Sequence, residues 1–264
     1  NIVKVLATIE EDEQHYVVMD YISGGDLRDL IERHRMKNEP MPIKRVLEIA
    51  LDLADALSRA HRLKIVHRDI KPANVLLGTN GSPYLTDFGV AFYGDLARVT
   101  RTGMTVGTLN YMSPESCAGE ALDGRADIWS LGVMLYEMLT LRRPFEASDT
   151  ADLLQSITRK TPESLAILRP DAPLALVSLV EGMLTKEPEL RISSVRLIGV
   201  LLESVMSDPE LTTGPPPNVA QEEITKIVPP VVRKKGVTNK IGGRETKIIS
   251  DDSGAFPNDQ EVKT

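Results

Sequence analysis

The chain opens with two stretches in which β-branched residues dominate. The runs "IVKVLATI" and "QHYVVMDYI" are separated by the acidic residues Glu10 to Glu13. Short runs of this kind, joined by a polar turn, are typical of adjacent antiparallel strands. The pattern predicts a β-hairpin within residues 1–22.

The apolar pattern then changes to the period of a helix. Asp26 precedes "LRDLIERHR" and is predicted to cap it, because a side-chain oxygen at this position accepts a free N–H of the first turn. Four later segments also have helical spacing, "RADIWSLGVMLYEMLT", "DTADLLQSI", "LALVSLVEGMLT" and "SVRLIGVLLESVM". The longest pattern covers residues 43–63, where apolar side chains recur at i, i+3, i+4 and i+7, at Val46, Leu47, Ala50, Leu53, Ala54 and Leu57.

The periodic pattern ends near Met206. Residues 207–264 are rich in proline, glycine, threonine and charged residues, with "ITKIVPPVV" as a short apolar cluster. Such a composition buries too little apolar surface to offset the entropy of ordering, so we predict a mostly disordered tail. The basic run Arg233 to Lys235 is short, which favours a solvated linker over a patch for nucleic acid or lipid.

Composition excludes several classes of function. The 264 residues carry a formal net charge of -7, which gives no broad attraction to nucleic acid or to acidic lipid. Cys117 is the single cysteine, which fits a reducing, cytoplasmic location, and no Cys/His group has the spacing of metal ligands. No apolar run approaches the roughly 18 residues of a membrane span, and the first residues do not resemble a secretory signal.

The candidate chemistry lies in "KIVHRDIKPANVLL", from Lys64 to Leu77. Asp69 lies on a bend before Lys71 and Pro72, where a carboxylate can accept a proton from a hydroxyl. Lys71 can neutralise an anion, and the amide oxygen of Asn74 and the carboxylate of Asp87 in "YLTDFGVA" suit magnesium. Each residue alone is more simply a turn residue. Together they describe phosphoryl transfer.

These motifs resemble those of the protein kinase family, in particular the bacterial-type serine/threonine kinases. "HRDIKPANVLL" resembles the catalytic loop, "DFG" the magnesium loop, "SPE" at residues 113–115 the A-P-E motif, and "DIWSLGVMLYEML" the helix that follows. The resemblance covers residues 1–206. It implies an α+β protein-kinase-like fold, with residual N-lobe strands and the hinge in residues 1–22, a helical C-lobe in 23–206 and the tail in 207–264.

The resemblance also implies roles for residues of the catalytic loop. Asp69 would be the base, Lys71 would stabilise the transferring phosphate, and Asn74 with Asp87 would hold Mg²⁺. Thr108 in "GTLNY" matches the threonine that contacts the catalytic aspartate, and Lys71 favours serine or threonine over tyrosine as the acceptor. The implied partners are ATP and protein substrates.

The segment "VVMDYISGGDL" resembles the hinge that binds ATP. Met19 would be the gatekeeper, the backbones of Asp20 and Ile22 would contact adenine, and Asp26 would contact the ribose. Leu76 would form the floor beneath the adenine.

Three threonines between the magnesium loop and "SPE" are candidate regulatory phosphosites. Thr100, Thr102 and Thr105 lie in "RVTRTGMTVGT", and Arg68 directly precedes the catalytic aspartate. In this family that arginine implies control by phosphorylation, since a phosphate adds about -1.5 to -2 charge and can pair with it. The alternative is a merely polar loop.

The resemblance further implies supporting contacts. Glu115 would pair with Arg191, a buried ion pair whose breakage costs about 3 to 5 kcal/mol. Asp127 would brace the catalytic loop, and Trp129 is expected in the core. We find no partner at useful spacing for three histidines and assign them to the surface or to helix packing: His15, His34 and His61.

Other family elements are not found upstream of the hinge. Residues 1–19 contain no glycine-rich loop, and Lys4 lies only 16 positions before Asp20, which leaves no room for the helix that carries the paired glutamate. We therefore interpret the chain as an N-terminally truncated kinase and expect weak ATP binding and slow transfer from it alone. One alternative is a pseudokinase-like binding module, but retention of the four catalytic-loop and magnesium-loop residues argues against it. The other alternative is a separately made regulatory C-lobe that binds a partner kinase, which the sequence does not exclude.

Overall fold

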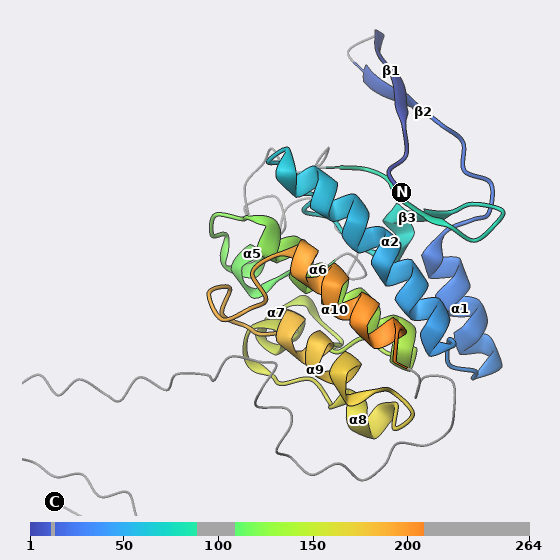
Figure 1. The fold of residues 1–264 in the computed structure, drawn as a ribbon. Helices are drawn as coiled ribbons and strands as arrows, with labels where there is room; N and C mark the ends of the chain where they lie inside the picture. The colour runs from blue at the N-terminus through green and yellow to red at the C-terminus, as the bar shows by residue number, and fades with distance from the viewer. Residues whose placement is uncertain (12–13, 89–108, 209–264) are drawn as a thin grey trace, which may run out of the picture. The chain divides into compact units, whose positions relative to one another are not determined.

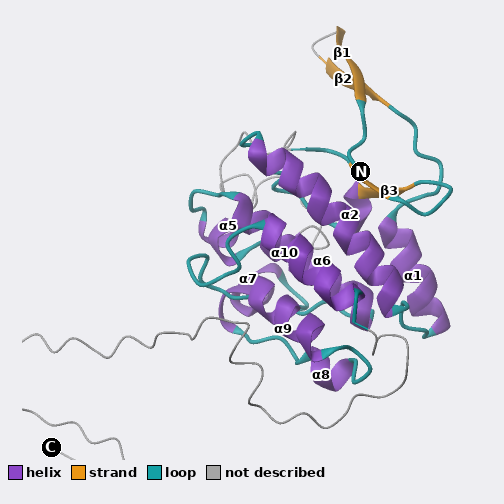
Figure 2. Ribbon diagram, in the orientation of Figure 1, coloured by secondary structure: helices purple, strands orange, loops and turns teal. Residues whose placement is uncertain are grey.

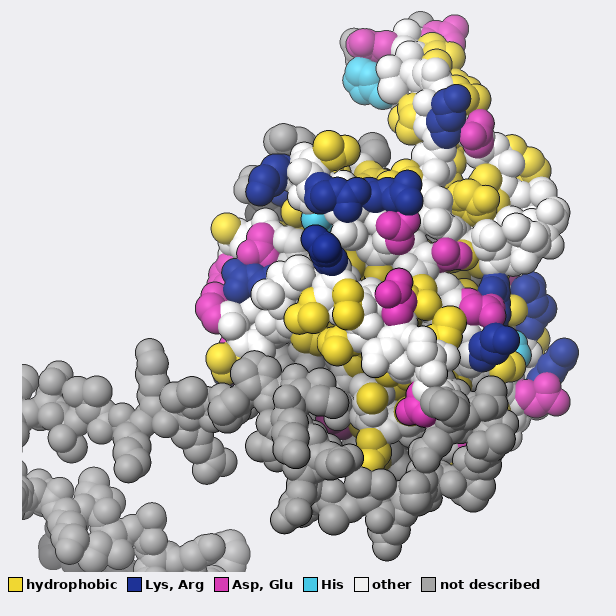
Figure 3. Space-filling view, viewed as in Figure 1, with side chains coloured by type: hydrophobic (Ala, Val, Ile, Leu, Met, Phe, Trp, Pro, Cys, Tyr) yellow, Lys and Arg dark blue, Asp and Glu magenta, His cyan; other side chains and the backbone are white. Residues whose placement is uncertain are grey.

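The predicted hairpin is present in the structure. The computed structural model describes residues 1–11, 14–88 and 109–208, and all of these lie in the first of two units of the chain, Asn1–Val219 and Ala220–Thr264. Strands β1 (Val5–Glu11) and β2 (Gln14–Met19) pair in antiparallel register, with Val5 opposite Met19 (Figure 1). Their side chains are largely exposed, and Figure 3 shows hydrophobic groups on the hairpin surface.

A second small sheet lies beside the catalytic loop. Strands β3 (Val75–Leu77) and β4 (Pro83–Leu85) pair antiparallel, and Leu85 also exchanges backbone hydrogen bonds with the segment before β1. The segment after β2 pairs with β3, because Gly24 N–H donates to Leu77 O at 2.8 Å. A Cβ on Gly24 would lie 2.3 Å from that oxygen, so this approach requires glycine.

Helices, joined by loops, account for the rest of the secondary structure in the described residues (Figure 2). The six helices expected from periodicity are confirmed; the short α5, α8 and 3₁₀ helix η1 were not predicted. The bounds are α1 Leu27–Lys37, α2 Ile43–Arg62, η1 Pro72–Asn74, α5 Pro114–Ala118, α6 Gly124–Thr140, α7 Thr150–Arg159, α8 Leu165–Leu168, α9 Leu174–Met183 and α10 Val195–Met206.

Side-chain caps fix where several helices begin. Asp26 caps α1 as predicted, since its Oδ1 accepts the N–H of Asp29 at 2.8 Å. Asp123 caps α6 in the same way, with its Oδ1 accepting the N–H of Arg125 at 2.8 Å. Because each cap satisfies a free N–H of the first turn, the starts of α1 and α6 are set by local sequence.

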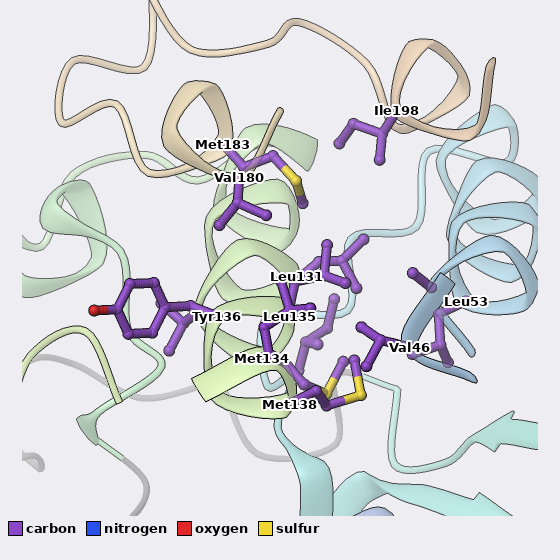
Figure 4. Packing of buried hydrophobic residues seen from close by; sticks show 14 of the residues in the cluster. Val46, Leu53, Leu131, Met134, Leu135, Tyr136, Met138, Val180, Met183 and Ile198 are labelled. Atoms are coloured by element: carbon purple, nitrogen blue, oxygen red, sulfur yellow. The ribbon is translucent and has the colours of Figure 1, made fainter. Parts of the chain in front are cut away.

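Helix α6 forms the centre of the core. Every residue from Ala126 to Leu139 is buried, and Figure 4 shows its side chains packed against Val46 and Leu53 of α2 and Val180 of α9. Each buried leucine contributes about 1.5–3 kcal/mol of hydrophobic stabilisation. The predicted stripe of α2 is buried throughout, and Trp129 is in the core as expected. Polar groups carried by α6 are therefore held in fixed positions.

Among the described residues, no helix combines the length and the apolar character that crossing a membrane demands.

Candidate active site

Asp127 of α6 holds the backbone of the catalytic loop. Its Oδ1 accepts the N–H of Arg68 at 2.8 Å, and its Oδ2 accepts the N–H of His67 at 2.9 Å. The Asp127 carboxylate is only 1% exposed, and Arg68 has a φ of 68°, a left-handed conformation that L-residues rarely adopt. The predicted bracing by Asp127 is confirmed, and it stabilises a strained loop one residue before Asp69.

The imidazole of His67 fixes the other side of this loop. Its Nδ1 accepts the N–H of Asp69 at 3.3 Å, so Nδ1 carries no proton, and its Nε2 donates to Thr86 O at 3.0 Å. The ring lies 4.4 Å from that of Phe88, measured between centroids. Burial lowers the pKa of His67, which favours the neutral form that this hydrogen-bond pattern requires.

The structure brings the three predicted catalytic-loop residues together. Lys71 Nζ lies 2.8 Å from Asp69 Oδ2, and Asn74 Nδ2 donates to the same oxygen at 2.9 Å and to Asp69 O at 2.8 Å. The side-chain donors that reach the Asp69 carboxylate among the described residues are Lys71 and Asn74, and both contact Oδ2. The other oxygen, Oδ1, is therefore left to accept a proton. The half-buried carboxylate is thus held in one orientation with one oxygen available.

The two predicted magnesium ligands lie at the same end of the β3–β4 pair, with Asn74 directly before β3 and Asp87 two residues after β4. Thr86 N–H donates to Asn74 O at 3.0 Å, and Asp87 follows Thr86 directly. Because the amide nitrogen of Asn74 is bound to Asp69, its Oδ1 is the free atom, and Asp87 is exposed with a φ of 60°. An amide oxygen and a carboxylate are a donor set that fits Mg²⁺.

The predicted magnesium site would have few protein ligands. Within the described ranges, no group of three or more His, Cys, Asp or Glu could hold a metal ion. A two-oxygen site suits a magnesium ion whose remaining ligands are water and substrate phosphates.

The predicted hinge residues lie along the segment from β2 to α1. Met19 ends β2, and Thr86 Oγ1 donates to its sulfur at 3.5 Å, which connects the hinge to the residue before Asp87. Asp20 uses its N–H for a bond of 2.9 Å to Lys4 O, so its carbonyl is the group that adenine would contact. Ile22 is half-buried.

Asp26 and Leu76 are brought side by side by an antiparallel bridge. Asp26 has other partners besides, because Oδ1 caps α1 and Oδ2 accepts from Arg28 Nη2 at 3.0 Å. A ribose hydroxyl would have to displace Arg28, whose exposed ion pair is weak.

Four predicted residues lie outside the described residues: Thr100, Thr102, Thr105 and Thr108.

The predicted ion pair of Glu115 and Arg191 is confirmed. Arg191 Nη1 and Nη2 lie 2.7 and 2.9 Å from the two carboxylate oxygens, and the side chains are 0% and 6% exposed. Burial disfavours the carboxylate, but hydrogen bonds from Arg191 and the backbone outweigh it and lower the pKa of Glu115. The pair fixes α5 to the loop before α10.

The prediction that the histidines lack partners is wrong for two of them. His61 Nε2 donates to Asp127 Oδ2 at 2.7 Å, and His34 Nδ1 lies 3.0 Å from Glu39 O. His61 and Asp127 are 66 positions apart, so helical spacing could not reveal the contact.

Sequence reasoning also missed a buried carboxylate on α6. Glu137 accepts hydrogen bonds from Arg35 Nη2 at 3.0 Å and from the hydroxyl of Tyr111 at 2.5 Å. Burial and the neighbouring Glu137 raise the pKa of Tyr111, so the phenol stays protonated. A glutamate within the apolar second half of α6 was the signal, because a buried charge needs partners.

The comparisons with known proteins agree with this geometry. Residues 1–204 match the family model described as protein kinase domain. The chain is 37% identical over 193 residues to a probable serine/threonine-protein kinase of Streptomyces coelicolor, covering 72% of this chain and 28% of that protein. It is 29% identical over 251 residues to the serine/threonine-protein kinase PrkC of Bacillus subtilis, covering 95% and 38%.

A third relative is the serine/threonine-protein kinase PknB of Mycobacterium leprae, 35% identical over 177 residues, covering 67% of this chain and 28% of that protein. The chain belongs to the protein kinase family, in its bacterial serine/threonine group. It spans between 28% and 38% of the length of these relatives.

Proposed function

We propose that the protein transfers the γ-phosphate of ATP to serine and threonine hydroxyls of other proteins. The observation that carries this proposal is the convergence of Lys71 and Asn74 on one oxygen of Asp69. In the reaction, the acceptor oxygen bonds to the γ-phosphorus, the bond from that phosphorus to the β–γ bridging oxygen breaks, and ADP leaves. The acceptor proton goes to Asp69 Oδ1, the oxygen left available by the two donors.

Asn74 Oδ1 and the Asp87 carboxylate would hold magnesium. When bound, Mg²⁺ offsets negative charge on the ATP phosphates. Lys71 is within reach of the same region, because its Nζ already lies 2.8 Å from Asp69. Its role is to stabilise the transferring phosphate while Asp69 orients the acceptor.

ATP would lie against the hinge, with Met19 as gatekeeper, the Asp20 carbonyl and the Ile22 N–H as adenine contacts, and Leu76 as the floor. Support comes from the pairing of Gly24 with Leu77, which fixes the hinge segment against β3. Asp26 would accept a hydrogen bond from a ribose hydroxyl in place of its present contact with Arg28.

Control by phosphorylation of Thr100, Thr102 and Thr105 is part of the proposal. Arg68 supports it, because its backbone is held by Asp127 while its guanidinium group, on an exposed residue, can pair with a phosphate. Thr108 would contact Asp69. Mass spectrometry of the active full-length protein without phosphate on this segment would rule out this regulation.

We also propose the domain boundaries of the chain, its cellular location and the class of partner that it does not bind. We divide the chain into N-lobe strands and hinge (1–22), C-lobe (23–206) and tail (207–264). The site of action is the cytoplasm, where ATP is available, and the single cysteine suits its reducing conditions. The net charge of -7 argues against nucleic acid as a partner.

The test is a phosphorylation assay with the full-length protein, Mg²⁺, ATP carrying a radioactive γ-phosphate, and a generic protein substrate. We expect label on serine and threonine, identified after acid hydrolysis, and loss of that label with EDTA or in Asp87→Asn. The matched control is Asp55→Asn, an exposed aspartate of α2. Label on tyrosine alone, or transfer that persists without divalent metal, would contradict the proposal.

A further inference from the structure

His61 lies one hydrogen bond away from the brace of the catalytic loop. It occupies the last turn of α2, and its Nε2 donates at 2.7 Å to Asp127 Oδ2. That oxygen also accepts the N–H of His67, and the other oxygen of the same carboxylate accepts the N–H of Arg68. Three donors from two segments therefore converge on one carboxylate that is almost fully buried.

The fold leaves a space for this imidazole. Gly124 is the first residue of α6, and a Cβ built there would lie 2.7 Å from Cε1 and 2.8 Å from Nδ1 of His61. Carbon atoms are not found this close to ring atoms, so any larger residue would push the ring away from Asp127. The His61 side chain is 20% exposed, so it closes the outer side of an otherwise buried contact.

We infer that His61 is a positioning residue for the catalytic base and acts through Asp127. This inference rests on the proposed kinase function. Arg68 is held in a left-handed conformation by Asp127, and that conformation sets the direction of the chain into Asp69. Without the His61 donor, Asp127 keeps the backbone N–H of His67 on Oδ2 and that of Arg68 on Oδ1, but Oδ2 loses its side-chain partner on the outer side. The carboxylate can then shift toward the space that the imidazole filled, and the backbone before Asp69 is held less tightly.

Displacement of a reacting group by about 1 Å can cost up to about 100-fold in rate. We therefore expect His61→Ala to lower kcat by roughly 10- to 100-fold. Substrate contacts are not touched by the substitution, so the KM values for ATP and for a peptide should change by less than about twofold. His61→Gln keeps an N–H donor at a similar reach and should recover most of the lost kcat.

Glycine substitution provides a second, independent perturbation. Gly124→Ala should lower kcat by displacing the imidazole, whereas Gly199→Ala in α10, where a Cβ meets no atom within 4 Å, should leave kcat unchanged. In the His61→Ala background, Gly124→Ala should cost nothing further, because no ring remains to be displaced. His34→Ala, at a half-buried histidine of α1, is the control for loss of an imidazole.

The experiment measures steady-state kcat and KM of the full-length protein and these variants, with circular dichroism to show that each is folded. Where His61→Ala does not fold, the His61→Gln and Gly124→Ala pair provides the same test. A loss in kcat that is recovered by glutamine and is non-additive with Gly124→Ala supports the inference. The inference is overturned if kcat of His61→Ala is unchanged, if the losses of His61→Ala and Gly124→Ala add, or if only KM changes. These outcomes count against the inference, and not against the proposed function, when Asp69→Asn abolishes transfer. Absence of transfer in the unmodified protein overturns the proposed function itself.

Discussion

Arg191→Met removes one partner of the most buried ion pair in the described residues and leaves the other in place. Besides its two bonds to Glu115, the guanidinium donates to three backbone carbonyls, those of Thr185 at 2.9 Å, Arg125 at 2.7 Å and Lys186 at 3.1 Å. Methionine has a similar length but no donor. The substitution therefore leaves a buried carboxylate and three carbonyls without this partner.

The expected cost follows from burial. Removing one member of a buried pair costs about 3–5 kcal/mol, because the remaining charge stays desolvated. In a domain of this size each kcal/mol shifts the Tm by roughly 2–4 °C, so we expect a fall of about 6–20 °C. In Glu115→Gln with Arg191→Met no unpaired charge remains, so the double variant should recover part of the loss.

The assay is thermal and urea unfolding of the full-length protein followed by circular dichroism. Arg59→Met is the matched control, since Arg59 and Asp55 form a pair that is 63% and 51% exposed and should contribute less than about 1 kcal/mol. If Arg191→Met lowers the free energy of unfolding no more than Arg59→Met does, the reasoning from burial is wrong.

Three further predictions concern stability and binding. Acidification should lower the free energy of unfolding below about pH 6.5, because the pKa of His67 is depressed in the folded protein and the unfolded chain therefore takes up a proton first. A second fall is expected below about pH 4.5, because the pKa of Glu115 is depressed in the same way. Urea titrations at pH 5 and 7.5, with His67→Asn as the control for the first fall, would contradict this if the free energy of unfolding were the same at both pH values. Lys64→Gly should raise stability by about 1 kcal/mol, since Lys64 has a φ of 63°, and a lower Tm would contradict this. Gly24→Ala should weaken ATP binding in calorimetry by separating the hinge from Leu77, whereas Gly199→Ala should not.

Local sequence predicted most of the fold. The stripe of α2 and the cap Asp26 depend on residues three or four positions apart, and such patterns are visible in the chain itself. The helices α5 and α8 were missed because five and four residues are too few to show a period. The hairpin was predicted correctly from its β-branched runs and polar turn.

The site was predictable only in part. Asp69, Lys71 and Asn74 are close in sequence, so their grouping followed from the motif, whereas the contacts among them are seen only in the structure. His61 and Glu137 were beyond reach, because their partners become neighbours only when α2, α1 and the segment before α5 pack against α6. Tertiary packing, and not local spacing, decides such contacts.

The most direct test of the account is a single-turnover measurement on Asp69→Asn in the full-length protein. Enzyme, MgATP and peptide are mixed so that only the chemical step is observed, and MgATP binding is measured separately. We predict that transfer slows by at least about 100-fold while the Kd for MgATP changes by less than about threefold. Transfer at the rate of the unmodified protein would contradict the assignment of Asp69 as the catalytic base.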